Sequence, residues 1–208
     1  MLNLSKFAKS FVKATKGVYK GSPRIYNIDR NIYISGYAEI NAQATSPFSR
    51  IKVHKGLFTC DVTDVLPGDL IQDRVDSNKY IVMSVKDKYC GDASIYFDCA
   101  LYYCNVSVDI ARYSDTGTRD SFNRLLASTP TVLYTNVPVM TDLKNVTIQD
   151  TPDRPIEEDK LNLYIQAKFD VHISDRLITT DNILYKVETI DKSSLENIWI
   201  CLVTKDDR

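Results

Sequence analysis

The spacing of apolar residues changes near residue 22, and this change predicts two kinds of secondary structure. Before it, apolar side chains recur at steps of three and four residues, the period of a helix with one apolar face. They are Leu4, Phe7, Phe11, Ala14 and Val18. From Ile25 onward, β-branched and aromatic residues alternate with polar ones in short runs, which is typical of strands. The pattern predicts a helix over residues 4–20, ended by Gly21-Ser22-Pro23, and then a mainly β chain.

One strand-turn-strand pattern occurs twice. The first copy runs from Gly68-Asp69-Leu70-Ile71 through a polar turn to Tyr80-Ile81-Val82-Met83-Ser84-Val85, and the second from Ser174-Asp175-Arg176-Leu177-Ile178 to Tyr185-Lys186-Val187-Glu188-Thr189-Ile190. With one single-residue gap, Asp69 aligns with Asp175 and Tyr80 with Tyr185. Pro23 and Pro130 stand at nearly the same distance before the two aspartates. A repeat of about 106 residues is too long for a solenoid unit and suits two tandem domains.

Each domain is expected to be a small, mostly antiparallel β-barrel of SH3-like or OB-like size, preceded by an α-helix. Short strands separated by glycine and proline favour a closed barrel, because closure leaves few exposed edges. A second helix is predicted after Ser114-Asp115, with an apolar stripe of Phe122, Leu125 and Leu126. The predicted organisation is a basic amphipathic helix in residues 1–22, a first barrel in 23–110, a linker with a short helix in 111–129 and a second barrel in 130–208.

Asp69 and Asp175 are interpreted as residues that organise the backbone. Each precedes an apolar strand, where an aspartate can accept hydrogen bonds from nearby backbone amides. Tyr80 and Tyr185 follow the polar turn in both copies, where an amphipathic ring can cover the end of a barrel. Because both copies keep these residues, a packing role common to both domains is more economical than one active site.

The composition restricts the compartment and the partners. The 208 residues carry a formal net charge of −1, which argues against a protein that coats nucleic acid over its whole surface. Five cysteines form no CxxC pair and leave an odd one, which suits reduced thiols better than a disulfide framework. No apolar run approaches the roughly 20 residues that span a membrane, and the N-terminus lacks the apolar stretch of a signal peptide. We therefore expect a soluble protein made in the cytosol.

The chain contains few of the residues that catalysis requires. His54 and His172 are its only histidines, so any Ser–His or Cys–His pair must use one of them. Both lie in predicted strands, without a nucleophile elbow nearby. Metal ligands are not clustered at ligand spacing, and no Walker A or GxGxxG sequence is present. The sequence predicts a protein that is not an enzyme and has no catalytic residues, no cofactor and no metal.

A stripe of lysines on the polar face of the predicted N-terminal helix is the strongest electrostatic feature. It consists of Lys6, Lys9, Lys13, Lys16 and Lys20. The first acidic residue is Asp29, so this arm is uniformly positive. A solvated face explains the stripe about as well as contact with nucleic acid, an anionic membrane surface or an acidic partner. The apolar face of the helix has two open alternatives, packing on the first barrel or on a neighbouring subunit.

Two long predicted loops are further candidate partner-binding surfaces. Residues 41–50 contain Phe48, an aromatic residue with no evident core role, and Arg50. Residues 150–160 are acidic and rich in proline, and they include Asp153, Pro155, Glu157 and Glu158. Long loops in compact domains often carry function. We therefore expect contacts with other subunits at both loops.

The repeated pattern of Gly-Asp, two apolar residues, a polar turn and Tyr-x-Val-x-x-Val resembles the small β-barrel head-completion or stopper proteins of tailed bacteriophages. Those proteins form a ring beneath the portal, seal the packaged DNA in the head and receive the tail. The resemblance covers about 18 residues per copy, at Gly68–Val85 and Asp175–Ile190. The chain departs from the family in having two such barrels instead of one, and in having Ser174 where the first copy has glycine.

The resemblance implies a structural virion protein, found in the host cytoplasm during assembly. It implies a homo-oligomeric ring whose partners are portal or adaptor proteins, tail proteins and packaged DNA, with no membrane. The doubled barrel leaves a tail or baseplate component open as an alternative. A second alternative is a barrel that binds single-stranded nucleic acid through a basic groove with aromatic platforms. Candidates for that groove are Arg50, Lys52, His54 and Lys55 near Tyr37, Phe48 and Phe58.

Overall fold

The computed structural model describes residues 25–34, 36–40, 53–58, 64–74, 77–90, 93–113, 130–143 and 160–206. Every secondary-structure element in these ranges is a β-strand. The chain forms two compact units, of which the first contains the described residues before Asn105 and the second nearly all of those that follow. The predicted mainly β, antiparallel architecture is confirmed. The helices predicted in residues 1–22 and after residue 114 lie outside the described residues.

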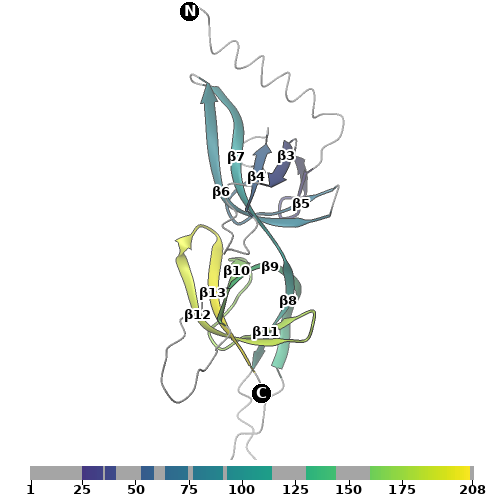
Figure 1. The fold of residues 1–208 in the computed structure, drawn as a ribbon, viewed down its shortest axis with the longest axis vertical. Helices are drawn as coiled ribbons and strands as arrows, with labels where there is room; N and C mark the ends of the chain where they lie inside the picture. Colours follow the sequence, from purple (N-terminus) through teal and green to yellow (C-terminus); the bar gives the residue numbers. More distant parts are fainter. Residues whose placement is uncertain are drawn as a thin grey trace, which may run out of the picture. The chain divides into compact units, whose positions relative to one another are not determined.

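The first unit contains a seven-stranded sheet (Figure 1). Its strands are β1 (Ile25–Asn27), β2 (Ile32–Ile34), β3 (Gly36–Ile40), β4 (Val53–Phe58), β5 (Leu70–Asp73), β6 (Lys79–Cys90) and β7 (Ala93–Tyr103). Hydrogen bonding places them in the order β2-β1-β5-β6-β7-β4-β3. Neighbouring strands are antiparallel throughout.

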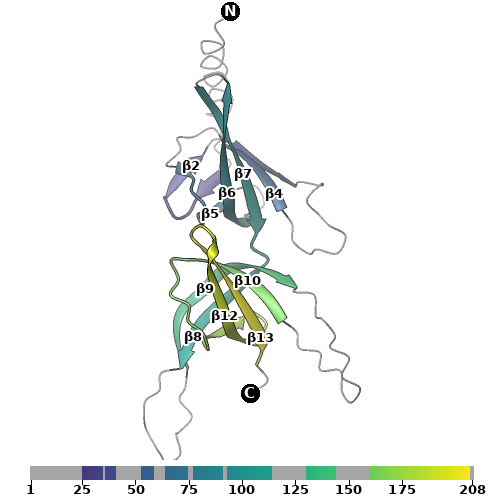
Figure 2. The ribbon, with the colours of Figure 1, turned by 90° about the vertical axis from the view of Figure 1, so that its left-hand side faces the viewer.

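The second unit contains six strands that form a closed barrel in the order β10-β13-β12-β11-β8-β9 (Figure 2). They are β8 (Val106–Tyr113), β9 (Pro130–Leu143), β10 (Lys160–Gln166), β11 (Arg176–Thr179), β12 (Leu184–Leu195) and β13 (Ile198–Lys205). Strand β9 closes the barrel by changing partner along its length. Its residues 130–139 pair with β8, and residues 140–143 pair with β10.

The two units share one strand connectivity. Strands β1, β4, β5, β6 and β7 correspond in order to β8, β10, β11, β12 and β13. Strands β2 and β3 together correspond to β9, because β2 pairs with β1 and β3 pairs with β4. A single residue, Ser35, separates β2 from β3. The strand order in the first unit is therefore that of the closed barrel when β2 and β3 together are counted as its closing strand.

The turn between the two central strands is also shared. Ser77 and Asn182 each have a φ of 58°, and each stands three residues before the aligned tyrosine, Tyr80 or Tyr185. In both turns the amide that ends the first strand donates across to the second strand, from Asp73 to Asn78 and from Thr179 to Ile183. This confirms the predicted alignment and its single-residue gap.

Alternate apolar side chains of the strands fill each interior. The first core contains Ile25, Ile34, Val65, Ile71, Tyr80, Val82, Phe97, Cys99 and Leu101. The second contains Val108, Ile110, Val137, Val139, Leu163, Ile165, Val171, Leu177, Val187, Cys201 and Val203. Burying one such aliphatic side chain stabilises a fold by roughly 1.5–3 kcal/mol, so these clusters are the main source of stability in both units.

Four sequence predictions need correction. Strand β8 belongs to the second barrel, so the first unit does not extend to residue 110 and the second does not start at Pro130. Pro130 opens β9, the counterpart of β2, whereas Pro23 precedes β1, so the two prolines are not equivalent. The linker predicted at residues 111–129 lies between two strands of one barrel and does not precede it. Tyr80 is 2% exposed and packs in the core against Tyr103, so it does not cover a barrel end.

Candidate functional site

The feature most clearly repeated in the structure is the turn that leads into the first central strand of each unit. We name these segments the entry turns, residues 65–69 before β5 and residues 171–175 before β11. The same three backbone hydrogen bonds hold both turns, at 2.7–3.1 Å. Their donors and acceptors are Gly68 and Val82, Asp69 and Leu66, and Val82 and Asp69 in the first unit, and Ser174 and Val187, Asp175 and His172, and Val187 and Asp175 in the second.

An aspartate carboxylate closes each entry turn from inside. Oδ2 of Asp69 accepts the amide of Leu66 at 2.9 Å, and Oδ2 of Asp175 accepts the amide of His172 at 2.7 Å. The prediction that both aspartates organise the backbone is confirmed. Asp69 is 9% exposed and Asp175 is 2% exposed. A carboxylate removed from water to this extent needs a compensating partner.

An arginine supplies that partner in both units, but in two ways. In the first unit, Nε of Arg30 lies 2.6 Å from Oδ2 of Asp69, and Nδ2 of Asn27 donates to the same oxygen at 2.8 Å. In the second unit, Arg112 donates to both oxygens of Asp175, from Nε at 2.9 Å and from Nη2 at 3.0 Å. A two-pronged arginine–carboxylate contact is stronger and more directional than a single hydrogen bond.

The carbonyl at the start of each entry turn is held as well. Asn27 donates from Nδ2 to the carbonyl of Asp64 at 2.9 Å, and Arg112 donates from Nη2 to the carbonyl of Asp170 at 2.7 Å. In the second unit, Arg112 alone therefore binds both the carboxylate and the carbonyl, whereas in the first unit Asn27 and Arg30 divide these contacts. These contacts raise the pKa of Arg112, chiefly through its hydrogen bond to Asp175, so the side chain stays charged.

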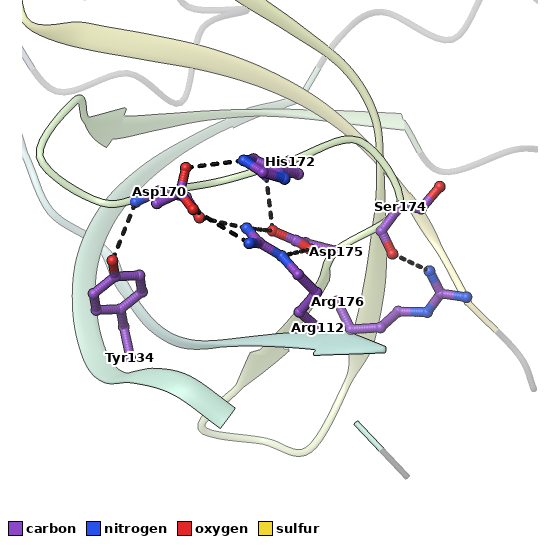
Figure 3. Close-up of polar contacts among 7 residues, drawn as sticks. All are labelled: Arg112, Tyr134, Asp170, His172, Ser174, Asp175 and Arg176. Carbon is purple, nitrogen blue, oxygen red and sulfur yellow. Dashed lines mark hydrogen bonds and ion pairs between the residues drawn. The ribbon is translucent and has the colours of Figure 1, made fainter. Parts of the chain in front are cut away.

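The second entry turn carries an additional charged pair (Figure 3). Nε2 of His172 lies 2.9 Å from Oδ1 of Asp170, whose other oxygen lies 3.2 Å from Nη1 of Arg112. The Asp170 amide donates to the Tyr134 hydroxyl at 3.5 Å. Arg112 is the main cause of a lowered pKa at Asp170. Both members of the His172–Asp170 pair are 55% exposed, so solvent screens this contact.

The His172–Asp170 pair has the form of an oriented general base, but none of the hydrogen bonds found among the described residues joins His172 to a hydroxyl or thiol. A histidine oriented by a carboxylate activates a hydroxyl or thiol only within hydrogen-bond reach. Ser174 lies beyond Asp175, away from His172, and its carbonyl accepts Nη1 of Arg176 at 2.8 Å (Figure 3). His54 lies in β4, as predicted, but His172 lies in a turn and not in a strand, which corrects that prediction.

The three cysteines whose side chains the structure describes, Cys99, Cys104 and Cys201, do not supply a nucleophile either. Burial raises the pKa of Cys104 to about 12 and that of Cys201 to about 12. Both thiols are therefore protonated at neutral pH, and the thiol form is the unreactive one. Cys99 is buried and unoxidised. This arrangement suits cysteines that act as small apolar core residues.

All the partner-binding residues predicted from the sequence lie outside the described residues. They are Lys6, Lys9, Lys13, Lys16, Lys20, Phe48, Arg50, Asp153, Pro155, Glu157 and Glu158. The two loop segments nevertheless occupy matching places in the chain, since residues 41–50 lie between β3 and β4 and residues 150–159 lie between β9 and β10. Sequence reasoning missed Asn27, Arg30 and Arg112, because the intervals between these residues and the repeated aspartates differ between the two units.

Two other features, a metal site and a membrane-spanning helix, were considered only within the described residues. Within them, no three residues of the His, Cys, Asp and Glu types are grouped so as to hold a metal ion. A helix long and apolar enough to cross a membrane is not found among the described residues. Comparisons with protein-family models, curated proteins and solved structures gave no match to this chain.

Proposed function

We propose that this protein is a non-enzymatic structural component of a bacteriophage virion, a ring-forming head–tail connector that joins the portal to the tail and helps to retain DNA. Its proposed location is the virion, and the host cytoplasm during assembly. The proposal rests on the resemblance of the repeated Gly-Asp…Tyr-x-Val pattern to head-completion proteins. The observation that carries it furthest is that this pattern forms the same braced entry turn in both units.

The entry turns support a structural role because their polar groups are used internally. The carboxylates of Asp69 and Asp175 bind amides and arginines of their own units. A catalytic carboxylate must instead be presented to a substrate. A feature conserved between two copies in one chain is more simply explained by a shared folding requirement than by two identical active sites.

We propose further that both units are small barrels of SH3-like or OB-like size. The support for the first unit is that its strand order becomes that of the closed second barrel once β2 and β3 are counted as one strand. Helices over residues 4–20 and after residue 114 remain part of the proposal.

The proposed partners are other copies of this chain, portal or adaptor proteins, and tail proteins, without a membrane or a cofactor. The two loops after β3 and β9 support this, because they leave equivalent strands and reach β4 and β10 at equivalent places. In a ring, the loop of one unit is therefore placed to make the contact that corresponds to the one made by the loop of the other unit. A tail or baseplate position is the alternative within the same class.

The test is to isolate virions that contain this chain and image them by cryo-electron microscopy. The proposal expects a ring of its copies between portal and tail. Density for the chain in the baseplate would move it to the alternative, and a chain absent from purified virions would contradict the structural proposal. Loss of a chemical activity on replacing His54 or His172 would contradict the non-enzymatic part.

A further inference from the structure

Four side chains form a row across the outer face of the first unit. Tyr33 of β2 is registered with Tyr26 of β1, Tyr26 with Gln72 of β5, and Gln72 with Lys79 of β6. Residues directly opposite in antiparallel strands share one face of the sheet. We name these residues, with Arg74, the aromatic–basic row. Four strands at about 4.8 Å spacing give it a length of roughly 15 Å.

The row points away from the core. Its neighbours along the strands, Ile25, Asn27, Ile71 and Asp73, are all buried, so alternation directs the row outward. Tyr33 is 58% exposed, so this aromatic side chain is accessible from solvent. The other members are half-buried or exposed along the same face.

The aromatic rings in the row are held in place and accompanied by cations. The rings of Tyr26 and Tyr33 lie 4.9 Å apart, and the Tyr26 hydroxyl donates to the side chain of Asn31. The guanidinium of Arg74 lies 5.2 Å from the centre of the Tyr33 ring. Gln72 donates to the carbonyl of Ser77 at 3.3 Å, which fixes its amide beside the rings.

The second unit does not repeat the row, although it repeats the strands. Asp109 stands at the place of Tyr26, Ile178 at that of Gln72 and Leu184 at that of Lys79. Opposite Asp109, β9 is irregular, and the amide of Asn136 donates to the Asp109 carboxylate at 2.7 Å. The shared fold therefore does not need an aromatic–basic row at this place. A surface set present in one copy alone points to a role beyond folding.

We infer that the aromatic–basic row binds single-stranded nucleic acid. Proteins bind such strands by stacking bases on aromatic side chains and by placing cations along the backbone phosphates. The row supplies both, with a tyrosine pair at one end, Arg74 beside it and Lys79 at the other end. An uncharged amide between them suits the polar edge of a base. The site differs from the predicted groove around Arg50, and it does not depend on the chain forming a ring.

The experiment is fluorescence anisotropy of the full chain with fluorescein-labelled 20-nucleotide dT and U strands at 50–300 mM salt. Wild type is expected to bind saturably, and the two strands distinguish DNA from RNA. Tyr33→Ala is expected to weaken binding by about 5- to 150-fold, the loss of one base–aromatic stack. Arg74→Gln is expected to lower the slope of log affinity against log salt by about 0.7.

Two controls keep the outcome interpretable. Tyr33→Phe keeps the stacking ring and is expected to bind like wild type. Tyr113→Ala removes a comparably exposed tyrosine of the second unit, which also has an arginine 5.2 Å from its ring, and should leave binding unchanged. Circular dichroism checks that each variant folds. Absence of saturable binding at 50 mM salt would overturn the inference, as would equal losses in Tyr33→Ala and Tyr113→Ala.

A Tyr33→Ala variant that blocks virion assembly without any strand binding by wild type would assign the row to a protein partner instead. Location of the chain in the particle is measured separately, so failure of this inference and failure of the proposed function are distinguishable.

Discussion

The two entry turns share their backbone hydrogen bonds and a buried aspartate, but different residues brace that aspartate. In the first unit, Gly68 takes the positive φ of 88° and the bracing is divided between Asn27 and Arg30. In the second, Ser174 takes a φ of 75° and Arg112 alone braces both the carboxylate and the carbonyl. The buried aspartate is what stays constant. The comparison teaches that the position of the carboxylate defines this element, and that the number of side chains bracing it and their place in the chain can differ.

The largest expected effect comes from removing that carboxylate. Asp175→Ala leaves the His172 amide without its acceptor and leaves Arg112 with Asp170 alone, and we expect the second unit to lose about 3 kcal/mol in free energy of unfolding. This is the low end for a broken buried pair, because Arg112 is 29% exposed. Trp199, the chain's only tryptophan, packs against the second core, so its fluorescence in a urea titration reports this unit.

The matched control for that variant is Asp181→Ala, an exposed aspartate in the turn of the same unit. It should shift the urea midpoint very little, as is usual for surface positions. Equal midpoints for Asp175→Ala and wild type would show that the carboxylate is not needed for stability.

Arginine-to-lysine exchanges compare the aspartate braced by two side chains, Asn27 and Arg30, with the aspartate braced by Arg112 alone. A lysine cannot reproduce the fork that Arg112 places on Asp175, so Arg112→Lys is expected to cost about 1.5 kcal/mol. Arg30→Lys is expected to cost less, about 0.5 kcal/mol, because Arg30 reaches a single oxygen of Asp69 through Nε, a geometry that a lysine ammonium can also adopt. Hydrogen-exchange mass spectrometry measures both units in one sample. A larger cost for Arg30→Lys would reverse the assigned roles.

Exchanging glycine and serine at positions 68 and 174 tests how much the positive φ of each entry turn affects stability. Ser174→Gly relieves a conformation that glycine adopts without strain, and we expect a gain of roughly 0.5–1 kcal/mol. Gly68→Ser imposes that strain on the first unit and also places a Cβ 2.5 Å from Cβ of Asn197 and 2.7 Å from its backbone oxygen, so the expected loss exceeds about 1 kcal/mol. Thermal unfolding of the pair checks these opposite signs, and two changes of the same sign would contradict the account.

The smallest effect concerns pH and the Asp170 carboxylate. Arg112 and His172 lower its pKa in the folded state, so its stabilising contribution is present above its unfolded pKa, near 4. That contribution is lost as pH falls through the lower folded value. Asp170→Asn should therefore be slightly less stable than wild type at pH 7, with the difference shrinking below pH 4. Urea midpoints between pH 7 and pH 3 measure it, and a difference that grows with acid would be the wrong sign.

Asp191 supplies a reference for this pH measurement. Hydrogen bonds lower the pKa of Asp191 to about 2, and the one from the Ser194 side chain contributes most, followed by that from the Ser193 amide. Asp191→Asn should remove stability that wild type keeps down to about pH 4 and loses towards pH 2. Because Asp191 does not contact Arg112, its effect should be unchanged in an Arg112→Lys background.

The strands, the two central hairpins and the aspartates could be predicted because they depend on local sequence. Alternation around Tyr80 and Tyr185, and an aspartate before an apolar strand, are visible within about 20 residues. The partners of those aspartates could not be predicted this way. Arg30 follows β1 and Arg112 lies in β8, both before the repeated segments, and they reach the aspartates only when β1 pairs with β5 and β8 with β11.

The domain boundary was missed for a related reason. Residues 114–129 separate β8 from β9, whereas a short turn separates β1 from β2. Because of this extra length, β8 lies far from the rest of its unit in the sequence. A domain boundary placed from the spacing of the repeat therefore put β8 in the first unit. Strand pairing, which is non-local, is what places it in the second barrel.

The central claim is that the two units are copies of one strand design, each held by a buried aspartate in its entry turn. Native-state hydrogen exchange of the full chain with Asp69→Asn or Asp175→Asn tests it most directly. The account predicts that Asp69→Asn accelerates exchange throughout β5, β6 and β7, and that Asp175→Asn does the same in β11, β12 and β13. Acceleration confined to the few amides of the altered turn, or seen in only one of the two variants, would contradict it.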